Sequence, residues 1–143
     1  MKNNLKKIFA FSLILIFCNS FADTKPVELE SNLGIKFLFL EDSSSPLINV
    51  MISFKNSGAA HMSKENSSLP MLYARTAPHC GSGNMDSAQL YQKLRNLSVS
   101  LAFYFSEDDV GLRVTFPKIV LNEVINLLND VIKSPKFNKD EVN

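Results

Sequence analysis

The sequence predicts an α+β domain with a mostly antiparallel sheet and helices packed on one face of that sheet. Two pairs of short apolar segments, each with the alternation or length typical of strands, occur in the chain. Apolar residues at helical spacing follow each pair. The predicted order is β-β-α-α-β-β-α, in which strands and helices are segregated rather than alternating, as in α+β domains.

The first 22 residues are separate from this domain and have the features of a secretory signal peptide. Lys2, Lys6 and Lys7 form a basic start, residues 8–17 form an apolar run of ten residues interrupted once by Ser12, and residues 20–22 form a small-x-small cleavage pattern. Ten helical residues are too short to cross a hydrocarbon layer of ~30 Å. The protein is therefore expected to be exported, and the short leader with its lysines favours a bacterial periplasm.

Charge and cysteine content exclude two further features. The chain has 15 basic and 14 acidic residues, and the leader takes three lysines and no acid, so residues 23–143 hold 12 against 14, or net −2. This balance leaves no basic patch that would argue for nucleic acid. Without the leader, Cys80 is the only cysteine, so no internal disulfide can form and packing must supply the stability.

The first half of the domain begins after a polar lead-in at residues 23–32. The first strand is expected within residues 35–42, which are apolar on both faces, and the second at residues 47–54. A turn at residues 43–46 separates them. Two strands joined by so short a turn are expected to pair antiparallel with each other.

A polar loop at residues 55–67 precedes the first helix. Leu69, Leu72 and Tyr73 have helical spacing, and the residues just before them, Asn66, Ser67 and Ser68, are all possible N-caps. Residues 78–84 then form a loop. Its Gly81-Ser82-Gly83 segment is interpreted as a flexible connector, since it lacks the lysine of a phosphate-binding loop and follows no strand.

The second helix has a well-defined start. Asp86 is a natural N-cap with Gln89 three residues later, and Met85 and Leu90 occupy the positions of a hydrophobic staple. The apolar stripe of this helix consists of Leu90, Leu94 and Leu97.

Two alternating strands follow, at residues 98–105 and 110–116, joined by an acidic hairpin. Pro117 is expected to open the longest helix and Pro135 to end it. The apolar stripe of this helix is Leu121, Val124, Ile125, Leu128, Val131 and Ile132. Residues 137–143 begin a further helix-like pattern that stops with the chain, so the domain is expected to be incomplete.

The order and spacing of these segments resemble the insulinase/pitrilysin-like (M16) metallopeptidase family. The resemblance covers residues 33–143 and implies an incomplete M16-like N-terminal domain. Members are built from duplicated α+β domains that enclose a peptide in a chamber. The segments that carry the resemblance are residues 33–35 with Glu41-Asp42, residues 52–58, residues 90–97, residues 127–130 and residues 134–137.

The family's zinc site is an inverted motif, His-x-x-Glu-His, on the first helix. Two histidines one turn apart hold the metal, and the Glu polarises the zinc-bound water. The resemblance places the first His at Met71, the Glu at Ala74 and the second His at Arg75. A thioether is a poor zinc ligand, a methyl group cannot accept a proton and a guanidinium cannot ligate. The family's further metal-binding Glu would lie past Asn143. The resemblance therefore implies no zinc cofactor and no peptidase activity.

Relocated metal ligands are the alternative. His61 and Glu65 are four residues apart, and His79 is next to Cys80. However, the first pair lies in a polar loop and two adjacent residues cannot easily share one ion, so solvated loop residues are the favoured interpretation. Arg75 has two interpretations: a rim residue of an amphipathic helix, or a replacement for the zinc charge that holds a substrate carboxylate or an acidic neighbour.

The favoured hypothesis is a secreted, catalytically inactive M16-like domain. Because zinc-less subunits of this family commonly pair with an active one, the resemblance implies a structural or substrate-binding role beside an M16-type zinc peptidase. The expected partners are that subunit and a peptide substrate, with no nucleic acid and no stable membrane span after signal cleavage. The alternatives are a truncated, non-functional remnant of an M16 gene and an active metallopeptidase with relocated ligands.

Overall fold

The computed structural model describes residues 25–137, in two units that divide between Ser44 and Ser45. The expected signal peptide and residues 138–143 lie outside the described residues. The first unit contains a hairpin of β1 (Val27–Glu30) and β2 (Lys36–Phe39), which pair antiparallel. No helix within residues 25–137 is long and apolar enough to cross a membrane.

The prediction that the first two expected strands pair with each other is wrong. β2 pairs with β1, which belongs to the stretch interpreted as a lead-in, and β3 (Leu47–Phe54) pairs with β6 instead. The physical reason is a tighter local turn. Ser31 N donates to the Ile35 carbonyl at 2.9 Å, and Ser31 Oγ accepts from Ile35 N at 3.1 Å. This turn brings the segment before β2 alongside it.

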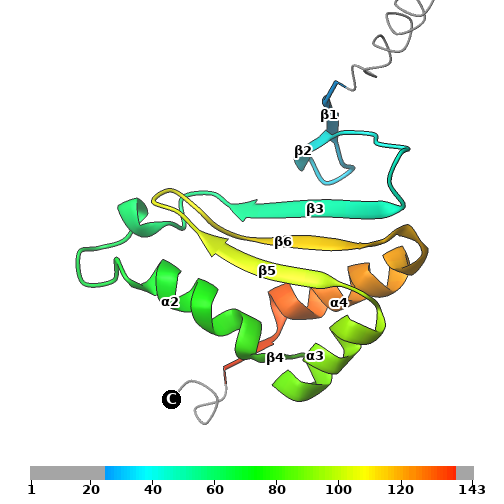
Figure 1. Cartoon of the computed structure of the whole chain (residues 1–143). Helices are drawn as coiled ribbons and strands as arrows, with labels where there is room; N and C mark the ends of the chain where they lie inside the picture. Colours follow the sequence, from blue (N-terminus) through cyan, green and yellow to red (C-terminus); the bar gives the residue numbers. More distant parts are fainter. Residues whose placement is uncertain (1–24, 138–143) are drawn as a thin grey trace, which may run out of the picture. The chain divides into compact units, whose positions relative to one another are not determined.

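The second unit is organised on a three-stranded antiparallel sheet with the order β3-β6-β5 (Figure 1). The central strand is β6 (Val110–Pro117), and β5 (Ser100–Phe105) joins it through the predicted hairpin. The alternation predicted for β6 is confirmed, because one of its faces is buried throughout. The buried residues of that face are Val110, Leu112, Val114 and Phe116.

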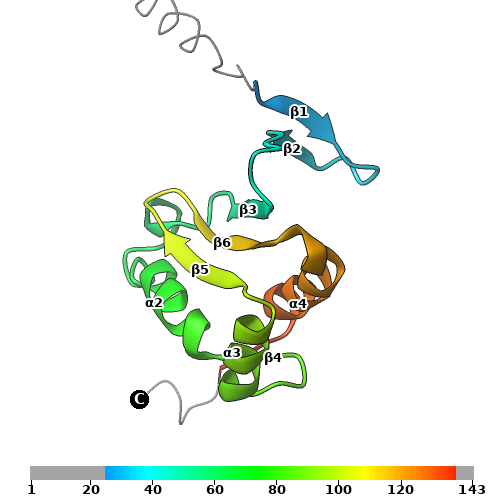
Figure 2. The ribbon, with the colours of Figure 1, turned by 45° about the vertical axis from the view of Figure 1, so that its right-hand side comes forward.

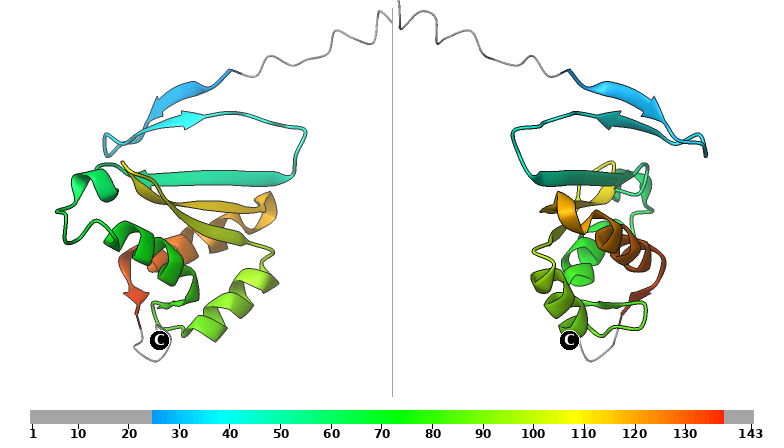
Figure 3. Two further views of the ribbon diagram at one scale, coloured as in Figure 1. Left: turned by 60° about the vertical axis from the view of Figure 1, so that its left-hand side comes forward. Right: turned by 90° about the vertical axis from the view of Figure 1, so that its right-hand side faces the viewer.

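Three helices cover this face of the sheet: α2 (Leu69–Thr76), α3 (Ser87–Asn96) and α4 (Leu121–Lys133). They lie on the same side of the sheet in each ribbon view (Figures 1 and 3). α4 packs Val124 into the cluster formed by the buried face of β6, while α3 packs Leu90 against Leu127 and Val131. The predicted α+β class, with helices on one face of an antiparallel sheet, is therefore confirmed.

The longest helix differs from its prediction in two respects. Pro117 ends β6 with an extended backbone, and the 3-10 turn η4 (Lys118–Val120) comes before α4. The buried stripe also has a different phase: Ile125 is 54% exposed, whereas Leu127 is 2% exposed. A helix that buries Val124 also buries positions three and seven residues later, and Ile125 falls outside that arc.

The segment after α2 is more ordered than predicted. It contains the 3-10 turn η3 (Ala77–His79) and the short strand β4 (Gly81–Ser82), which pairs with β7 (Pro135–Lys136). Gly83 N adds a hydrogen bond of 2.9 Å to the Ser134 carbonyl. The interpretation of this segment as a flexible connector is wrong, because the strand pairing ties it to the end of α4.

The loop between β3 and α2 is held against the β5–β6 hairpin. Its 3-10 turn η2 (Ala59–His61) follows Gly58, whose N donates to the Asp108 carbonyl at 2.9 Å. A Cβ atom at Gly58 would lie 2.3 Å from the Glu107 carbonyl oxygen, so this close approach requires glycine. These contacts determine where the chain enters α2.

The start of α3 is as predicted. Asp86 Oδ1 accepts a hydrogen bond from Gln89 N at 2.7 Å, and Gln89 Oε1 accepts one from Asp86 N at 3.0 Å. Met85 packs against the cluster that contains Leu90, which completes the hydrophobic staple. After α3, Ser98 adopts a positive φ of 54°, so the next strand begins at Ser100 rather than at Ser98.

Replacing Asp86 with Ala tests this capping arrangement. The variant loses the acceptor for Gln89 N, and we expect the free energy of unfolding in urea to fall by about 1 kcal/mol. The matched control is Lys93→Ala, at an exposed position of the same helix, which we expect to change it by less than ~0.5 kcal/mol. Equal losses in the two variants would contradict a specific role for the cap.

Candidate functional site

Helix α2 carries the positions that the sequence analysis compared with a zinc motif. It lies against β5 and β6, as seen where it runs beside β5 in Figure 2. Pro70 and Ala74 are its buried residues, whereas Leu69 and Leu72 are about half exposed. No side chain caps its first turn, and the first helical bond runs from Leu72 N to the Ser68 carbonyl at 3.0 Å. The residues proposed as N-caps therefore do not act through their side chains.

The three compared positions divide between the two faces of α2. Met71 and Arg75 are both exposed and, being four residues apart, project to the same side of the helix. Ala74 is 6% exposed and faces the core of the unit. Within residues 25–137 no carboxylate lies at salt-bridge distance from Arg75. The exposure of Arg75 agrees with its interpretation as a surface residue of an amphipathic helix.

The other candidate ligands lie in different environments. His61 Nε2 is 3.4 Å from Asp108 Oδ1, and Glu65 is exposed on the following loop. His79 is exposed, whereas Cys80 is 2% exposed and its Sγ donates to the Thr76 carbonyl at 3.3 Å. Across the described residues, no three His, Cys, Asp or Glu side chains are arranged to hold a metal ion.

Tyr73 connects α2 to its surroundings. Its ring meets Phe103 of β5 edge to face, with centroids 5.9 Å apart, and lies 6.0 Å from the ring of Phe137. Burial raises the pKa of the Tyr73 hydroxyl above its usual value, and the nearby Cys80 thiol adds to the increase. The side chain is thus an anchor between three segments of the unit.

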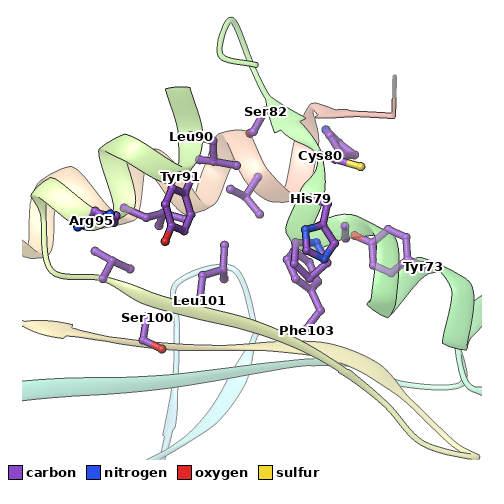
Figure 4. Close-up of a pocket in the computed structure, with 17 residues that line it drawn as sticks. Tyr73, His79, Cys80, Ser82, Leu90, Tyr91, Arg95, Ser100, Leu101 and Phe103 are labelled. Atoms are coloured by element: carbon purple, nitrogen blue, oxygen red, sulfur yellow. The ribbon is translucent and has the colours of Figure 1, made fainter. Parts of the chain in front are cut away.

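A cavity of about 350 Å³ lies beside the end of α2, where η3, α3, β5 and the end of α4 meet (Figure 4). Its inner wall includes the buried residues Ser82, Leu90 and Val131, and its rim includes the exposed residues Tyr91 and Arg95. Ser82 Oγ is buried and has no hydrogen-bond partner. Sequence reasoning missed this cavity because its residues come from four separate segments. The only local signal was the Gly-Ser-Gly run.

The sequence matches no family model and no curated protein. Solved structures do match the fold. The periplasmic protease PqqL from Escherichia coli superposes with a TM-score of 0.72 at 18% identity, over 85% of this chain and 13% of that one. A mutant of the ferredoxin protease FusC, in complex with Arabidopsis ferredoxin, gives a TM-score of 0.69 at 16% identity, over 85% and 14%. A peptidase M16 inactive domain from Pseudomonas fluorescens gives 0.67 at 17% identity, over 81% and 28%.

These matches confirm the predicted M16-like fold. The chain has the fold of an M16 peptidase domain, and it spans between 13% and 28% of the length of the three structures named above. At 16–18% identity the likeness is one of fold.

The titration of Tyr73 gives a prediction with a definite sign. Because its pKa is raised above 10.0 in the folded chain, the folded state holds the proton more tightly than the unfolded state does. The resulting stability is complete below about pH 10 and is lost as the pH rises through the folded pKa. As the pH rises from about 9 to about 11, we expect the Tyr73→Phe variant to lose less of its stability than the parent chain loses of its own. Urea unfolding at each pH measures this, and parallel stability curves would contradict it.

The orientation of positions 71 and 75 is tested by building a metal site. In the double variant Met71→His/Arg75→His, two imidazoles would lie one turn apart on the exposed side of α2, the spacing with which paired helical histidines bind zinc. We expect titration calorimetry to show Zn²⁺ binding at least ~tenfold tighter than in the control Met71→His. Equal affinities would mean that the two positions do not face the same side.

Proposed function

We propose that this chain is an exported, catalytically inactive M16 peptidase-like domain that serves as a structural or substrate-binding partner of an active M16-type zinc peptidase. The observation that carries the proposal is the chemistry of α2. In the fold's first helix after the leading strands, Met71, Ala74 and Arg75 stand where the resemblance expects His, Glu and His. None of these side chains can hold zinc or activate water.

The structural neighbours support this role. One of them is described as an inactive domain of peptidase M16, so the fold also occurs in domains described as inactive. Another is a protease in complex with a protein, ferredoxin, which fits a role in contacting polypeptide substrates. The description of PqqL as a periplasmic protease agrees with export to the periplasm, as the leader suggests.

The sheet offers a place for a peptide. In the described residues β5 is an edge strand, because the order β3-β6-β5 leaves one side without a neighbouring strand. An extended peptide can add to such an edge through main-chain hydrogen bonds, while alternate side chains select its sequence. Substrate binding by this route requires no metal.

The outer side of α2 offers a place for a protein partner. Leu69 and Leu72 are 50% and 53% exposed. Leu69 also lines an apolar groove, together with Phe54, Met62, Pro70 and Val110. Adjacent exposed apolar residues of this kind are typical of protein interaction sites. Burial of α2 by a partner would also cover Met71.

The test is co-purification with an M16-type zinc peptidase encoded in the same genome. We expect the tagged chain to co-elute with that peptidase, and we expect the purified chain alone to hydrolyse no peptide and to contain less than stoichiometric zinc by elemental analysis. Zinc at one equivalent, or hydrolysis by the chain alone, would sink the inactive-subunit proposal. An unfolded monomer that recovers no peptidase would instead favour a non-functional remnant.

A variant pair localises the contact. Leu69→Asp/Leu72→Asp places two charges on the outer side of α2, and we expect at least a ~tenfold loss of affinity for the peptidase. The matched control is Ile119→Asp, at a 90% exposed apolar residue of η4, which should leave the affinity unchanged. An equal loss in the control would contradict docking on α2.

A further inference from the structure

The outer edge of β3 has no neighbouring strand among the described residues. In the sheet order β3-β6-β5, β3 is hydrogen-bonded on one side only. Its eight residues, Leu47–Phe54, form a continuous strand that contains no charged residue, no proline and no glycine. Natural edge strands usually carry charges, prolines or bulges that prevent pairing with another chain. Because β3 lacks these features, its edge can accept a further strand.

The register with β6 shows which main-chain groups of β3 face outward. Opposed residues of an antiparallel pair alternate between hydrogen-bonded and non-hydrogen-bonded pairs. Lys118 N donates to the Pro46 carbonyl at 2.9 Å, one position before the first pair of the β3–β6 ladder, and this bond fixes the phase of the alternation. The residues of β3 that direct their main-chain groups away from β6 are therefore Leu47, Asn49, Met51 and Ser53. The N–H groups of the last three have no hydrogen-bond partner within residues 25–137.

The helix layer leaves room beside β3. α2 packs on β5 and β6, α3 packs on β5 and α4 packs on β6, so the principal helix contacts are with the other two strands. In Figure 1, β3 is the strand of this sheet that lies farthest from the three helices. Its side chains on the helix side, Ile48, Val50 and Ile52, are only partly buried. A second sheet can therefore approach this edge without a collision between helices.

The main chain of β3 is complementary to that of a second copy. We consider antiparallel pairing about a twofold axis that passes through Val50. Asn49 then lies opposite Met51 of the second copy, and Leu47 lies opposite Ser53. All of these are outward-facing residues, so each opposed pair can exchange two hydrogen bonds, which gives roughly eight across the two strands.

The side chains are complementary in the same register. On the helix side Val50 meets Val50 of the second copy, and Ile48 meets Ile52. Cross-strand pairs of β-branched residues stabilise a sheet. A shift of the register by one residue would place these side chains opposite residues of the other face, so the apolar pattern selects against it.

Opposite charges flank the strand. Lys55 follows β3 directly, and Glu41 and Asp42 precede it in the sequence. All three are exposed, and none forms an ion pair within residues 25–137. Antiparallel pairing brings the end of one strand beside the start of the other, so Lys55 of each copy approaches the acidic segment of the other copy. No like charges are opposed along the strand itself.

We propose that the partner of the β3 edge is a second copy of this chain, in a twofold dimer that joins two three-stranded sheets into one. The pairing closes on itself, because it uses the β3 edge of both copies. It leaves the β5 edge free. The dimer is therefore independent of the proposed role beside a peptidase, and each can fail without the other.

Sedimentation equilibrium of the purified chain tests the dimer. One strand per copy is a small interface, so we expect a monomer–dimer equilibrium with a Kd on the order of 10 μM. A chain that remains monomeric at about 1 mM would overturn the proposal. Species larger than a dimer would contradict a closed twofold pairing.

A charge on the edge tests which strand is involved. Met51 is 59% exposed, and Met51→Lys should weaken the dimer at least ~fivefold, because it puts a lysine on the edge of each copy. The matched control is Ala102→Lys, at an exposed position on the same face of the sheet in the other edge strand β5. We expect the control to leave the Kd unchanged. An equal effect of the two variants, or an effect of the control alone, would refute pairing through β3.

A charge pair tests the register. Asn49→Glu keeps an acceptor for Thr115 Oγ1, which donates to Asn49 Oδ1 at 2.7 Å, and alone it should weaken the dimer as Met51→Lys does. In the double variant Asn49→Glu/Met51→Lys each glutamate lies opposite a lysine of the other copy. We expect the Kd to return to within about threefold of the parent value. Additive losses would contradict the register centred on Val50.

Hydrogen exchange gives a readout without any substitution. The amide hydrogens of Asn49, Met51 and Ser53 should exchange at least ~fivefold more slowly at a concentration that populates the dimer than after dilution. The control amides are those of Leu101 and Phe103, which point away from β6 by the same alternation, since Ser106 N donates to the Asp109 carbonyl at 2.8 Å. Protection of the β5 amides instead of the β3 amides would overturn the proposal.

Discussion

Burial of the central strand β6 is the constraint on which the rest of the second unit depends. Both of its edges are hydrogen-bonded, to β3 and to β5, and its buried face carries three of the least exposed side chains described: Leu112, Val114 and Phe116. Such a face must be covered, and α4 covers part of it with Val124. α2 and α3 take the remaining places on the same side of the sheet. The exposed side of α2 is therefore determined by the packing of the sheet.

The packing of α2 depends on one side of the helix only. α2 retains the packing role of a first helix, with Pro70 and Ala74 buried and Tyr73 anchored on Phe103 and Phe137. The scaffold needs small or apolar side chains on the inner side of the helix, and it places no demand on the exposed positions 71 and 75. The residues at these two positions can therefore change while the domain keeps its shape.

Local signals in the sequence predicted most of the second unit. The capping box at Asp86 and the alternation in residues 110–116 each depend on neighbours within a few residues, so they were visible without the structure. The pairings β1–β2 and β4–β7 were not visible in the sequence. The second of them joins residues more than fifty positions apart. The cavity was missed for the same reason. Ser82 and Arg95 have no common pattern, and the packing of α3 against β4 places both of them along this cavity.

The edge position of β5 has a consequence for how the chain behaves at high concentration. The strand reads Ser-Leu-Ala-Phe-Tyr-Phe, with no charge and no proline, and so lacks the residues that usually protect a sheet edge from other chains. Segments of this composition self-associate into stacked sheets when left uncovered. The strand that could receive a peptide is therefore also one through which copies of the chain would aggregate. Solubility would then depend on how quickly that edge is covered.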